Sequence, residues 1–205
     1  GKSRLINLIP RFYDVTEGSI RIDGIDVRKF NLKALRKKIG FIRQKNLLFT
    51  GTIKSNIKFG KPHATHDEVE NSAKIAQAYD FITTKEKGFD EPISEGGSNV
   101  SGGQKQRLAI ARALVRKSEI YIFDDSFSAL DFKTDAILRK ALKKETKDAI
   151  VLIVAQRIGS IMDADKIIVL DEGKVVGVGK HKELLSTCNV YHEIALSQLT
   201  EEELA

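Results

Sequence analysis

The hydrophobic residues of the chain follow two patterns, one typical of buried strands and one typical of amphipathic helices. Residues 120–123 (IYIF) and 149–155 (AIVLIVA) are apolar without alternation, as expected for strands of a parallel sheet that is covered on both faces. Between them, residues 133–144 (KTDAILRKALKK) space their apolar positions as a helix does. A strand, a helix and a strand in this order predict a βαβ unit, and hence an α/β fold.

Alternating apolar and polar residues predict two β-hairpins outside this unit. The first spans residues 18–30 (GSIRIDGIDVRKF) around a central Asp-Gly turn, and the second spans residues 165–180 with its turn at 171–173. A further short strand is expected within residues 39–44 (IGFIRQ).

Helical periodicity marks most of the remaining elements. Residues 66–85 are expected to form one helix. A second helix, at 104–116, directly follows a glycine-rich loop at 94–103 (SEGGSNVSGG). Shorter helices are expected at 5–9, at 31–38 and in two segments that close the chain. Together these elements predict a mostly parallel sheet with a mainly helical lobe around residues 50–115.

Composition narrows the classes of function. Of the 205 residues, 41% are apolar and 30% charged, the balance of a soluble globular protein. The longest apolar run, 149–155, is far shorter than the roughly 20 residues that cross a bilayer. The net charge of +6 could attract nucleic acid or a membrane surface, but no aromatic residues are interleaved with the lysines, which favours solvated helix faces. The single cysteine, Cys188, excludes an internal disulfide.

Two adjacent carboxylates, Asp124 and Asp125, end the apolar strand at 120–123. The carboxyl edge of a parallel sheet is where ligands bind in open α/β folds, and a carboxylate there can hold the Mg²⁺ of a nucleotide. Asp124 is therefore a candidate metal ligand. A helix cap or a surface acid is the alternative interpretation.

Two segments have the residue types of phosphate-binding loops. Gly1-Lys2-Ser3 has the form of the last three positions of G-x-x-x-x-G-K-[ST]. That tripeptide is frequent by chance, but a helical pattern follows it at once. Residues 99–107 (NVSGGQKQR) combine a serine, two glycines and a helix start, which together predict a second anion site. A flexible loop that caps a helix is the alternative there.

With these residues in place, the chain resembles the nucleotide-binding domain of ATP-binding-cassette (ABC) transporters over residues 1–205. Six segments resemble the family's motifs in the family's order: GKS (the end of Walker A), FIRQ with Gln44 (Q-loop), VSGGQ (signature), IYIFDD (Walker B), SALD with Asp131 (D-loop) and VAQRIGSI with Gln156 (switch segment). Residues 47–60 (LLFTGTIKSNIKFG) resemble the exporter branch. The resemblance implies a P-loop NTPase core with a mostly parallel sheet, β-hairpins and an inserted helical subdomain at about 50–115.

The resemblance also implies a role for each site residue, with ATP and Mg²⁺ as the bound groups. Phosphate contacts are implied for Gly1 and Lys2, and Mg²⁺ contacts for Ser3, Gln44 and Asp124. The catalytic set that it implies is Asp125, Gln156 and Gln44. Contacts with the ATP of a second, head-to-tail subunit are implied for Ser101, Gly102, Gly103 and Gln104, with Asp131 beside them.

Three residues depart from the family's pattern. Asp125 stands where glutamate is usual, and it is shorter by one methylene, about 1.5 Å; misplacing a catalytic group by about 1 Å can cost roughly 100-fold in rate. Gln156 replaces a histidine and cannot take up a proton near neutral pH. Arg4 replaces a threonine or serine. We therefore expect a site that binds Mg·ATP but hydrolyses it slowly; the alternative is that these are tolerated variants in a working enzyme.

A sound signature beside a weakened Walker B predicts a heterodimer, in which this chain completes the active site of a competent partner; a homodimer is the alternative. A transmembrane domain, on the same or a partner chain, is expected, with this domain at the cytoplasmic face of the membrane. No nucleic acid is expected as a partner. The start at Gly1, without the strand that leads into Walker A, predicts that the chain is part of a longer one.

Three other classes remain as alternatives. A chromosome-maintenance or DNA-repair ATPase shares these motifs, but it inserts a long coiled coil between Walker A and the signature, and no sustained heptads run between residues 4 and 99. A translation-associated ABC protein carries two cassettes where this chain has one. A module in which ATP only holds two domains together is the third.

Overall fold

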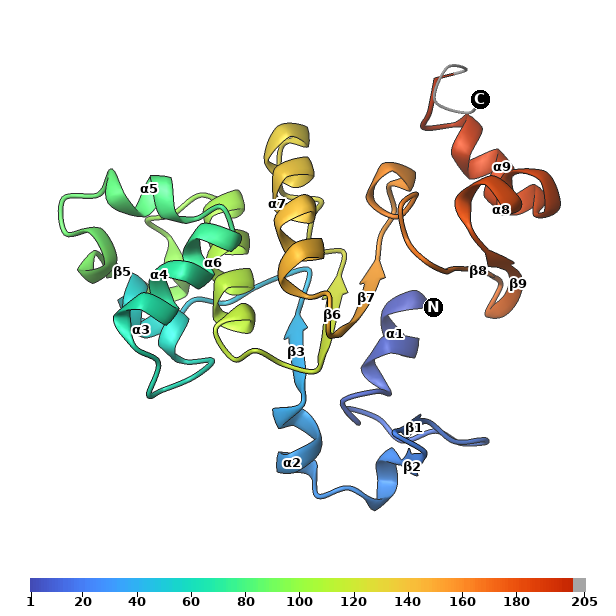
Figure 1. Cartoon of the computed structure of the whole chain (residues 1–205), viewed down its shortest axis with the longest axis horizontal. Coiled ribbons are helices and arrows are strands. Elements are labelled where there is room, and N and C mark those ends of the chain that lie inside the picture. Colours follow the sequence, from blue (N-terminus) through green and yellow to red (C-terminus); the bar gives the residue numbers. More distant parts are fainter. Residues whose placement is uncertain (201–205) are drawn as a thin grey trace.

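A parallel sheet forms the centre of the computed structural model, which describes residues 1–200 (Figure 1). In this three-stranded sheet, β6 (Ile120–Asp124) lies between β3 (Ile39–Ile42) and β7 (Ile150–Val154) and pairs in parallel with both. The helix α7 (Phe132–Glu145) connects β6 to β7, which confirms the predicted βαβ unit. The carboxyl ends of the strands meet at one edge, where Asp124 lies.

The segment before β3 forms one side of the molecule. Its elements are α1 (Lys2–Asn7), the antiparallel pair β1 (Arg21–Ile22) and β2 (Ile25–Asp26), the 3₁₀ turn η1 (Val27–Lys29) and α2 (Leu32–Lys37). The first predicted hairpin is therefore confirmed, although each of its strands has only two residues. The side chain of Asn31 caps α2 by accepting hydrogen bonds from the next turn.

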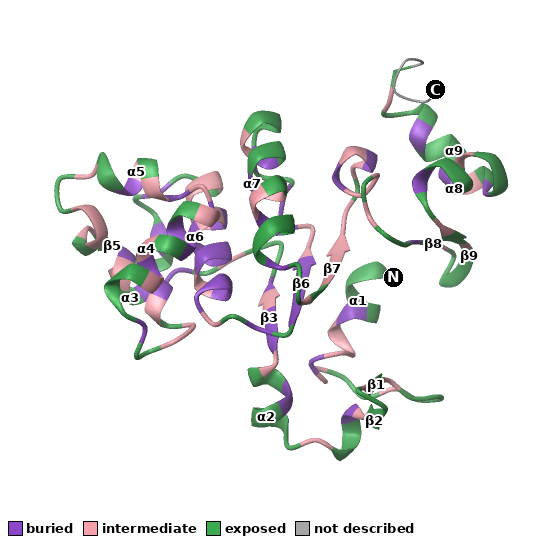
Figure 2. Ribbon diagram, in the orientation of Figure 1, coloured by how far each residue is buried: buried purple, intermediate pink, exposed green. Residues whose placement is uncertain are grey.

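Residues 51–114 form a mainly helical lobe on the opposite side of β3 (Figure 1). Its elements are β4 (Gly51–Thr52), α3 (Ile53–Lys58), α4 (His66–Ile75), α5 (Tyr79–Thr83), η2 (Gly88–Asp90), β5 (Pro92–Ile93), η3 (Glu95–Gly97) and α6 (Gly102–Leu114). Figure 2 shows buried residues on the faces of α3, α4 and α6 that point toward one another.

The expected single helix over residues 66–85 is wrong, because the helix ends at Ile75 and the chain turns before α5. Gln77 has a φ of 57°, and the N–H of Ala78 donates to the carbonyl of Ala73 at 2.7 Å. This is a Schellman motif, with glutamine at the left-handed position that glycine usually takes.

The helix expected at residues 104–116 begins earlier, at Gly102, and ends at Leu114. Ser101 caps it: its Oγ accepts from the N–H of Gln104, and the Gln104 side chain accepts from the N–H of Ser101. This reciprocal pair satisfies backbone donors that would otherwise lack a partner at the helix start.

Alternate residues of β6 pack into two different cores. Tyr121 and Phe123 belong to the larger core, together with residues of α6 and α7. Ile120 and Ile122 belong to a smaller core with residues of α1 and α2. Because neighbouring side chains of a strand point to opposite faces, β6 is buried on both faces, as its sequence predicts.

The expectation that the strand at 149–155 is also covered on both faces is wrong. The five residues of β7 are half-buried or exposed, and Ile150 is 61% exposed. Within residues 1–200, the outer edge of β7 pairs with no other strand.

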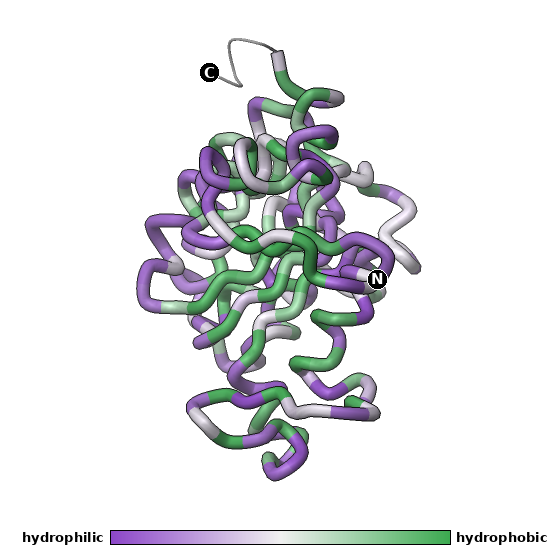
Figure 3. Tube along the Cα trace, turned by 90° about the vertical axis from the view of Figure 1, so that its right-hand side faces the viewer, coloured by the Kyte–Doolittle hydropathy of each residue, from purple (hydrophilic) through white to green (hydrophobic). Residues whose placement is uncertain are grey.

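The remaining residues form a C-terminal lobe with its own core, which contains Ile158, Leu184 and Tyr191. Its elements are η4 (Ile158–Ser160), the antiparallel hairpin of β8 (Ile167–Asp171) and β9 (Lys174–Gly179), α8 (His181–Thr187) and α9 (Asn189–Leu196). The second predicted hairpin and the two closing helices are thus confirmed. Hydrophobic stretches of the chain run through the middle of the molecule (Figure 3). Every helix in residues 1–200 is too short or too polar to cross a bilayer.

Candidate functional site

Ser3 and Asp124 are brought together at the carboxyl edge of the sheet, although 121 positions separate them in sequence. Ser3 lies in the first turn of α1, and Asp124 is the last residue of β6. The Ser3 hydroxyl donates to Oδ1 of Asp124 at 2.8 Å. A hydroxyl and a carboxylate therefore present hard oxygen atoms at one point.

Asp125 accepts two side-chain amides on one oxygen. Gln44 Nε2 donates to Oδ2 of Asp125 at 2.8 Å, and Gln156 Nε2 donates to the same atom at 3.1 Å. The backbone of Asp125 has a φ of 48°, and its N–H donates to the carbonyl of Val154 at 2.9 Å. The predicted catalytic residues thus lie together, with segments after β3, β6 and β7 each contributing one.

The electrostatic surroundings of Asp125 raise the pKa of its carboxyl above the usual value. Burial raises the pKa of Asp125, and the neighbouring charge of Asp124 raises it further. Lys2, Arg157 and the hydrogen bond from Gln156 act in the opposite direction on that pKa. Lys2 is the first residue of α1 and directly precedes Ser3. Gly1 caps α1 beside it, and Arg4 is exposed.

Two serines that the sequence patterns did not single out hold the turn after the aspartates. The buried Ser126 donates its Oγ to the carbonyl of Ile42 at 2.9 Å, which ties β6 to the end of β3. Ser128 donates its Oγ to the carbonyl of Asp125 at 3.0 Å. Ser128 is the first residue of the SALD segment and Ser126 lies just before it, but nothing in the sequence distinguishes either from another small turn residue.

A cavity of about 220 Å³ lies beside Asp125. It is lined by Asp125, Phe127, Ser128, Val154, Ala155, Gln156, Arg157 and Ser160. The guanidinium of Arg157 lies 5.0 Å from the ring centroid of Phe132, an exposed aromatic at the start of α7. The turn after β6 and the segment after β7 therefore enclose space next to the candidate base.

The glycine-rich segment is not brought to these aspartates. Among the described residues, the Ser101 side chain hydrogen-bonds only to Gln104, and Ser101 and Gly102 are exposed at the start of α6. A Cβ on Gly103 would lie 3.4 Å from the carbonyl of Ala129, so the start of α6 borders the SALD turn. The two predicted phosphate-binding segments therefore do not form one pocket within a single molecule.

Asp131 has a structural role that its own geometry defines. Its Oδ1 accepts from the N–H of Thr134 at 2.9 Å, and its Oδ2 accepts from the Thr134 hydroxyl at 2.7 Å. These hydrogen bonds lower the pKa of Asp131. Asp131 is thus the N-cap of α7.

Comparison with known proteins assigns the chain to a family. The family model described as "ABC transporter" matches residues 1–128. The chain belongs to the ABC transporter family.

Relatives of this ABC protein are larger than the chain. Proteins of Staphylococcus aureus strains NCTC 8325 and COL, each named as a putative multidrug export ATP-binding/permease protein, are 47% identical to it over 194 residues. These residues cover 95% of this chain and 34% of each relative. The solved structure of a bacterial Atm1-family ABC exporter with ATP bound matches with a TM-score of 0.95 and 38% identity, over 98% of this chain and 35% of that one. The fold is the α/β P-loop NTPase core of ABC ATPases.

The oxygen atoms of Ser3 and Asp124 fit a Mg²⁺ ion that is bound together with phosphate. Mg²⁺ is usually held by one or two protein oxygens, with phosphate and water completing its octahedron. In residues 1–200 no cluster of three or more His, Cys, Asp or Glu side chains could hold a metal by itself. The donors on this chain would therefore form part of a coordination shell that nucleotide phosphates complete.

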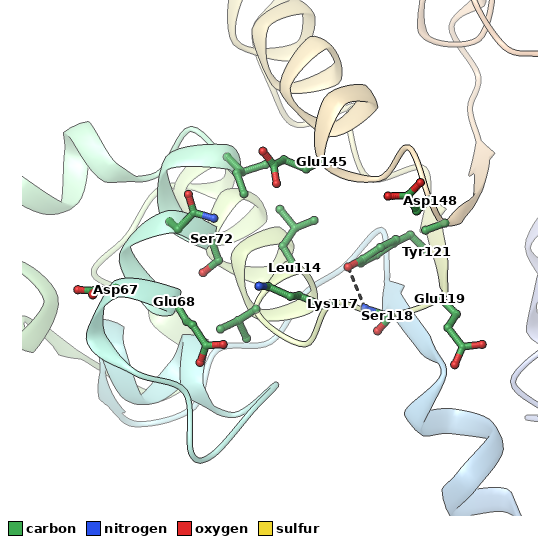
Figure 4. A pocket seen from close by; sticks show the side chains of 14 residues that line it. Asp67, Glu68, Ser72, Leu114, Lys117, Ser118, Glu119, Tyr121, Glu145 and Asp148 are labelled. Carbon is green, nitrogen blue, oxygen red and sulfur yellow. Dashed lines mark hydrogen bonds between the residues drawn. The ribbon is translucent and has the colours of Figure 1, made fainter.

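A second cavity of this ABC domain lies away from that chemistry. It has a volume of about 560 Å³ and lies between α4, the end of α6 and the end of α7 (Figure 4). Its wall includes the acidic residues Asp67, Glu119, Glu145 and Asp148. None of the predicted site residues lines this cavity, although its volume exceeds that of the cavity beside Asp125.

Proposed function

We propose that this chain is the ATP-binding and ATP-hydrolysing component of an ABC exporter. The observation that carries the proposal is the pair of contacts at the sheet edge: Ser3 on Asp124, and Gln44 with Gln156 on Asp125. The names of the relatives, which are export ATP-binding/permease proteins, support transport over the maintenance of DNA.

In the proposed site, each residue has its own role. Lys2 would neutralise phosphate oxygens, and the oxygens of Ser3 and Asp124 would hold Mg²⁺. The Asp125 carboxylate accepts a proton from the attacking water, and Gln44 orients that carboxylate. Bound Mg²⁺ would supply charge neutralisation for the phosphates.

Slow hydrolysis follows from the two residues that depart from the family's pattern. Asp125 reaches about 1.5 Å less far than glutamate, so its carboxylate lies further from the attacking water than a consensus base does. Gln156 can donate a hydrogen bond but cannot shuttle a proton near neutral pH. The site is therefore suited to hold Mg·ATP for longer than a consensus site does.

A second subunit is needed to complete each ATP site. Ser101, Gly102 and the free end of α6 are exposed and do not meet the Walker residues of the same molecule. Two such domains packed head to tail would place each signature on the other's ATP. We expect a heterodimer with a competent partner, attached to a transmembrane domain at the cytoplasmic face of a membrane.

Slow hydrolysis is tested by restoring the usual residues of the family, a longer carboxylate at position 125 and a histidine at position 156. In the assembled exporter, Asp125→Glu together with Gln156→His should raise single-turnover hydrolysis at this chain's own Walker site by about 100-fold, as expected for a catalytic group returned to its place. Asp125→Asn is the matched control, since it keeps the size of the side chain and removes its charge; it should lower the rate. Rapid hydrolysis by the unaltered site would contradict the proposal.

A further inference from the structure

Side chains from outside the switch segment (residues 154–161) hold it in place. Two of them come from α7: the Phe132 ring lies under the Arg157 guanidinium at 5.0 Å, and Arg139 Nη1 donates to the carbonyl of Gly159 at 2.7 Å. A third, Gln198, comes from the turn after α9, about 40 positions further along the chain.

The side-chain amide of Gln198 binds the backbone on both sides of Arg157. Its Nε2 donates to the carbonyl of Gln156 at 2.8 Å, and its Oε1 accepts from the N–H of Ile158 at 2.8 Å. One planar amide thus satisfies a backbone acceptor and a backbone donor two residues apart, as a neighbouring strand would. This contact restrains the backbone that carries the Gln156 side chain.

The two bonded residues belong to different parts of the molecule. The side chain of Gln156 reaches Asp125, whereas Ile158 is buried in the core of the C-terminal lobe, with Tyr191 and Ala195 of α9. The backbone between them is therefore the direct connection from that lobe to the candidate base, and Gln198 fixes both of its ends.

We infer that Gln198 is a positioning residue, which holds the Gln156 amide on Asp125 from the C-terminal lobe. The inference rests on the proposed function, because it concerns hydrolysis at the same site. It makes the C-terminal lobe part of the catalytic apparatus: a displacement of α9 would move Gln156, and a shift of about 1 Å at a catalytic group can change a rate roughly 100-fold.

A double-mutant cycle in the assembled exporter tests this role. Gln198→Ala should lower single-turnover hydrolysis at this chain's own Walker site by about tenfold, which corresponds to about 1.4 kcal/mol, while the affinity for Mg·ATP changes less than about twofold. In a Gln156→Ala background, Gln198→Ala should have no further effect on the rate, because Gln198 acts through Gln156.

Two more variants separate positioning from folding. Gln198→Glu keeps an acceptor for the Ile158 N–H but places a carboxylate oxygen against the Gln156 carbonyl, so it should match Gln198→Ala. Ser197→Ala is the matched control, since Ser197 donates only within α9, to the carbonyl of Ile194 at 2.7 Å; it should leave the rate unchanged. Hydrogen exchange should be faster in residues 155–160 of Gln198→Ala and unchanged in β6.

Equal losses from Gln198→Ala with and without Gln156 would overturn the inference, because they would indicate a merely structural effect. A rate unchanged by Gln198→Ala would overturn it as well, and in both cases the proposed function would stand. Failure of the unaltered exporter to bind or hydrolyse ATP would instead refute the proposed function, and this inference with it.

Discussion

At the residue scale, two identical side chains next to each other take different partners. Asp124 faces a hydroxyl, and Asp125 faces two amides. The hydroxyl of Ser3 has lone pairs, so it can bind a cation together with Asp124. The amide N–H groups of Gln44 and Gln156 can only donate hydrogen bonds, and they donate them to Asp125. The partners, more than the residue type, therefore support the proposal that the first aspartate holds Mg²⁺ and the second acts on the attacking water.

Removal of the Ser3 hydroxyl should affect Mg·ATP and spare metal-free ATP. Ser3→Ala should weaken binding of Mg·ATP by about tenfold, or about 1.4 kcal/mol, since alanine keeps α1 intact and removes one metal ligand. Calorimetric titrations with Mg²⁺ and with EDTA measure the two affinities. Ser3→Thr retains the hydroxyl and should bind Mg·ATP as the unaltered chain does. If Ser3→Ala binds Mg·ATP as tightly as the unaltered chain, Ser3 is not a ligand of Mg²⁺.

The cap at Asp131 should give stability a dependence on pH. Hydrogen bonds from Thr134 lower the pKa of Asp131 in the folded state, so its stabilising effect is complete above the unfolded value of about 3.9 and is lost as the pH falls through the lower folded value. Asp131→Ala should therefore reduce the thermal midpoint at pH 7 and should cost less at pH 2. A penalty that stays constant with pH would show that the carboxylate does not act as this cap.

At the element scale, α6 connects the signature to the segment after the Q-loop. Near its C-terminal end, Arg112 Nε donates to the carbonyl of Asn56 at 2.8 Å, and its Nη1 donates to the carbonyl of Leu47 at 2.9 Å. The guanidinium also lies over the rings of Phe49 and Phe59. Burial lowers the pKa of Arg112. One side chain thus fixes α6 to both α3 and the loop before it.

Loss of this contact should destabilise the helical lobe. Arg112→Ala should reduce the free energy of unfolding by about 2–4 kcal/mol, because it removes the donor from the carbonyl of the buried Asn56 and the packing of the guanidinium on two rings. Urea denaturation measures the change. Arg112→Lys should recover only part of the loss, since an ammonium cannot donate in a planar fork; full recovery by lysine would indicate that charge alone matters.

Which elements can be predicted from the sequence depends on whether the deciding contact is local. The buried strand at 120–123 and the hairpin at residues 165–180 are set by local patterns, and both are found. The break at Gln77 has no local signal, because the residues around it all favour helix; α6 helps to hold it, through Arg107 Nη1 on the Gln77 carbonyl at 2.7 Å. The exposure of β7 depends on what covers a strand, which its own apolar run does not reveal.

At the scale of the whole molecule, the site lies where three packed regions meet. Asp124 ends β6, which packs into a core on each of its faces, and Ser3 lies on α1, which packs into one of them. The switch segment is anchored in the C-terminal core by Ile158. The sequence motifs predict which residues gather there, because each Walker and switch residue is identified by its own motif. Gln198 is in no motif, and only its position in the fold indicates a role.

The position of the signature segment, at the exposed start of α6, bears on whether one molecule forms a whole ATP site or only half of one. Ser101 caps α6 and is exposed, so a substitution there can change the helix as well as the proposed contact with a partner's nucleotide. Aspartate caps helices as well as serine does, but its charge would face the partner's triphosphate. Ser101→Asp should therefore leave α6 intact and disrupt only the proposed contact between subunits.

The most direct measurement is steady-state ATP hydrolysis by the assembled exporter with Ser101→Asp in this chain. The account predicts a loss of about 100-fold or more, as expected when an interaction with the transferring phosphoryl group is replaced by repulsion, with an unchanged thermal midpoint and unchanged Mg·ATP affinity at this chain's own Walker site. Ser101→Thr, which keeps the hydroxyl, should retain most of the activity. Turnover that is indifferent to Ser101→Asp would contradict the claim that each molecule supplies half of its neighbour's site.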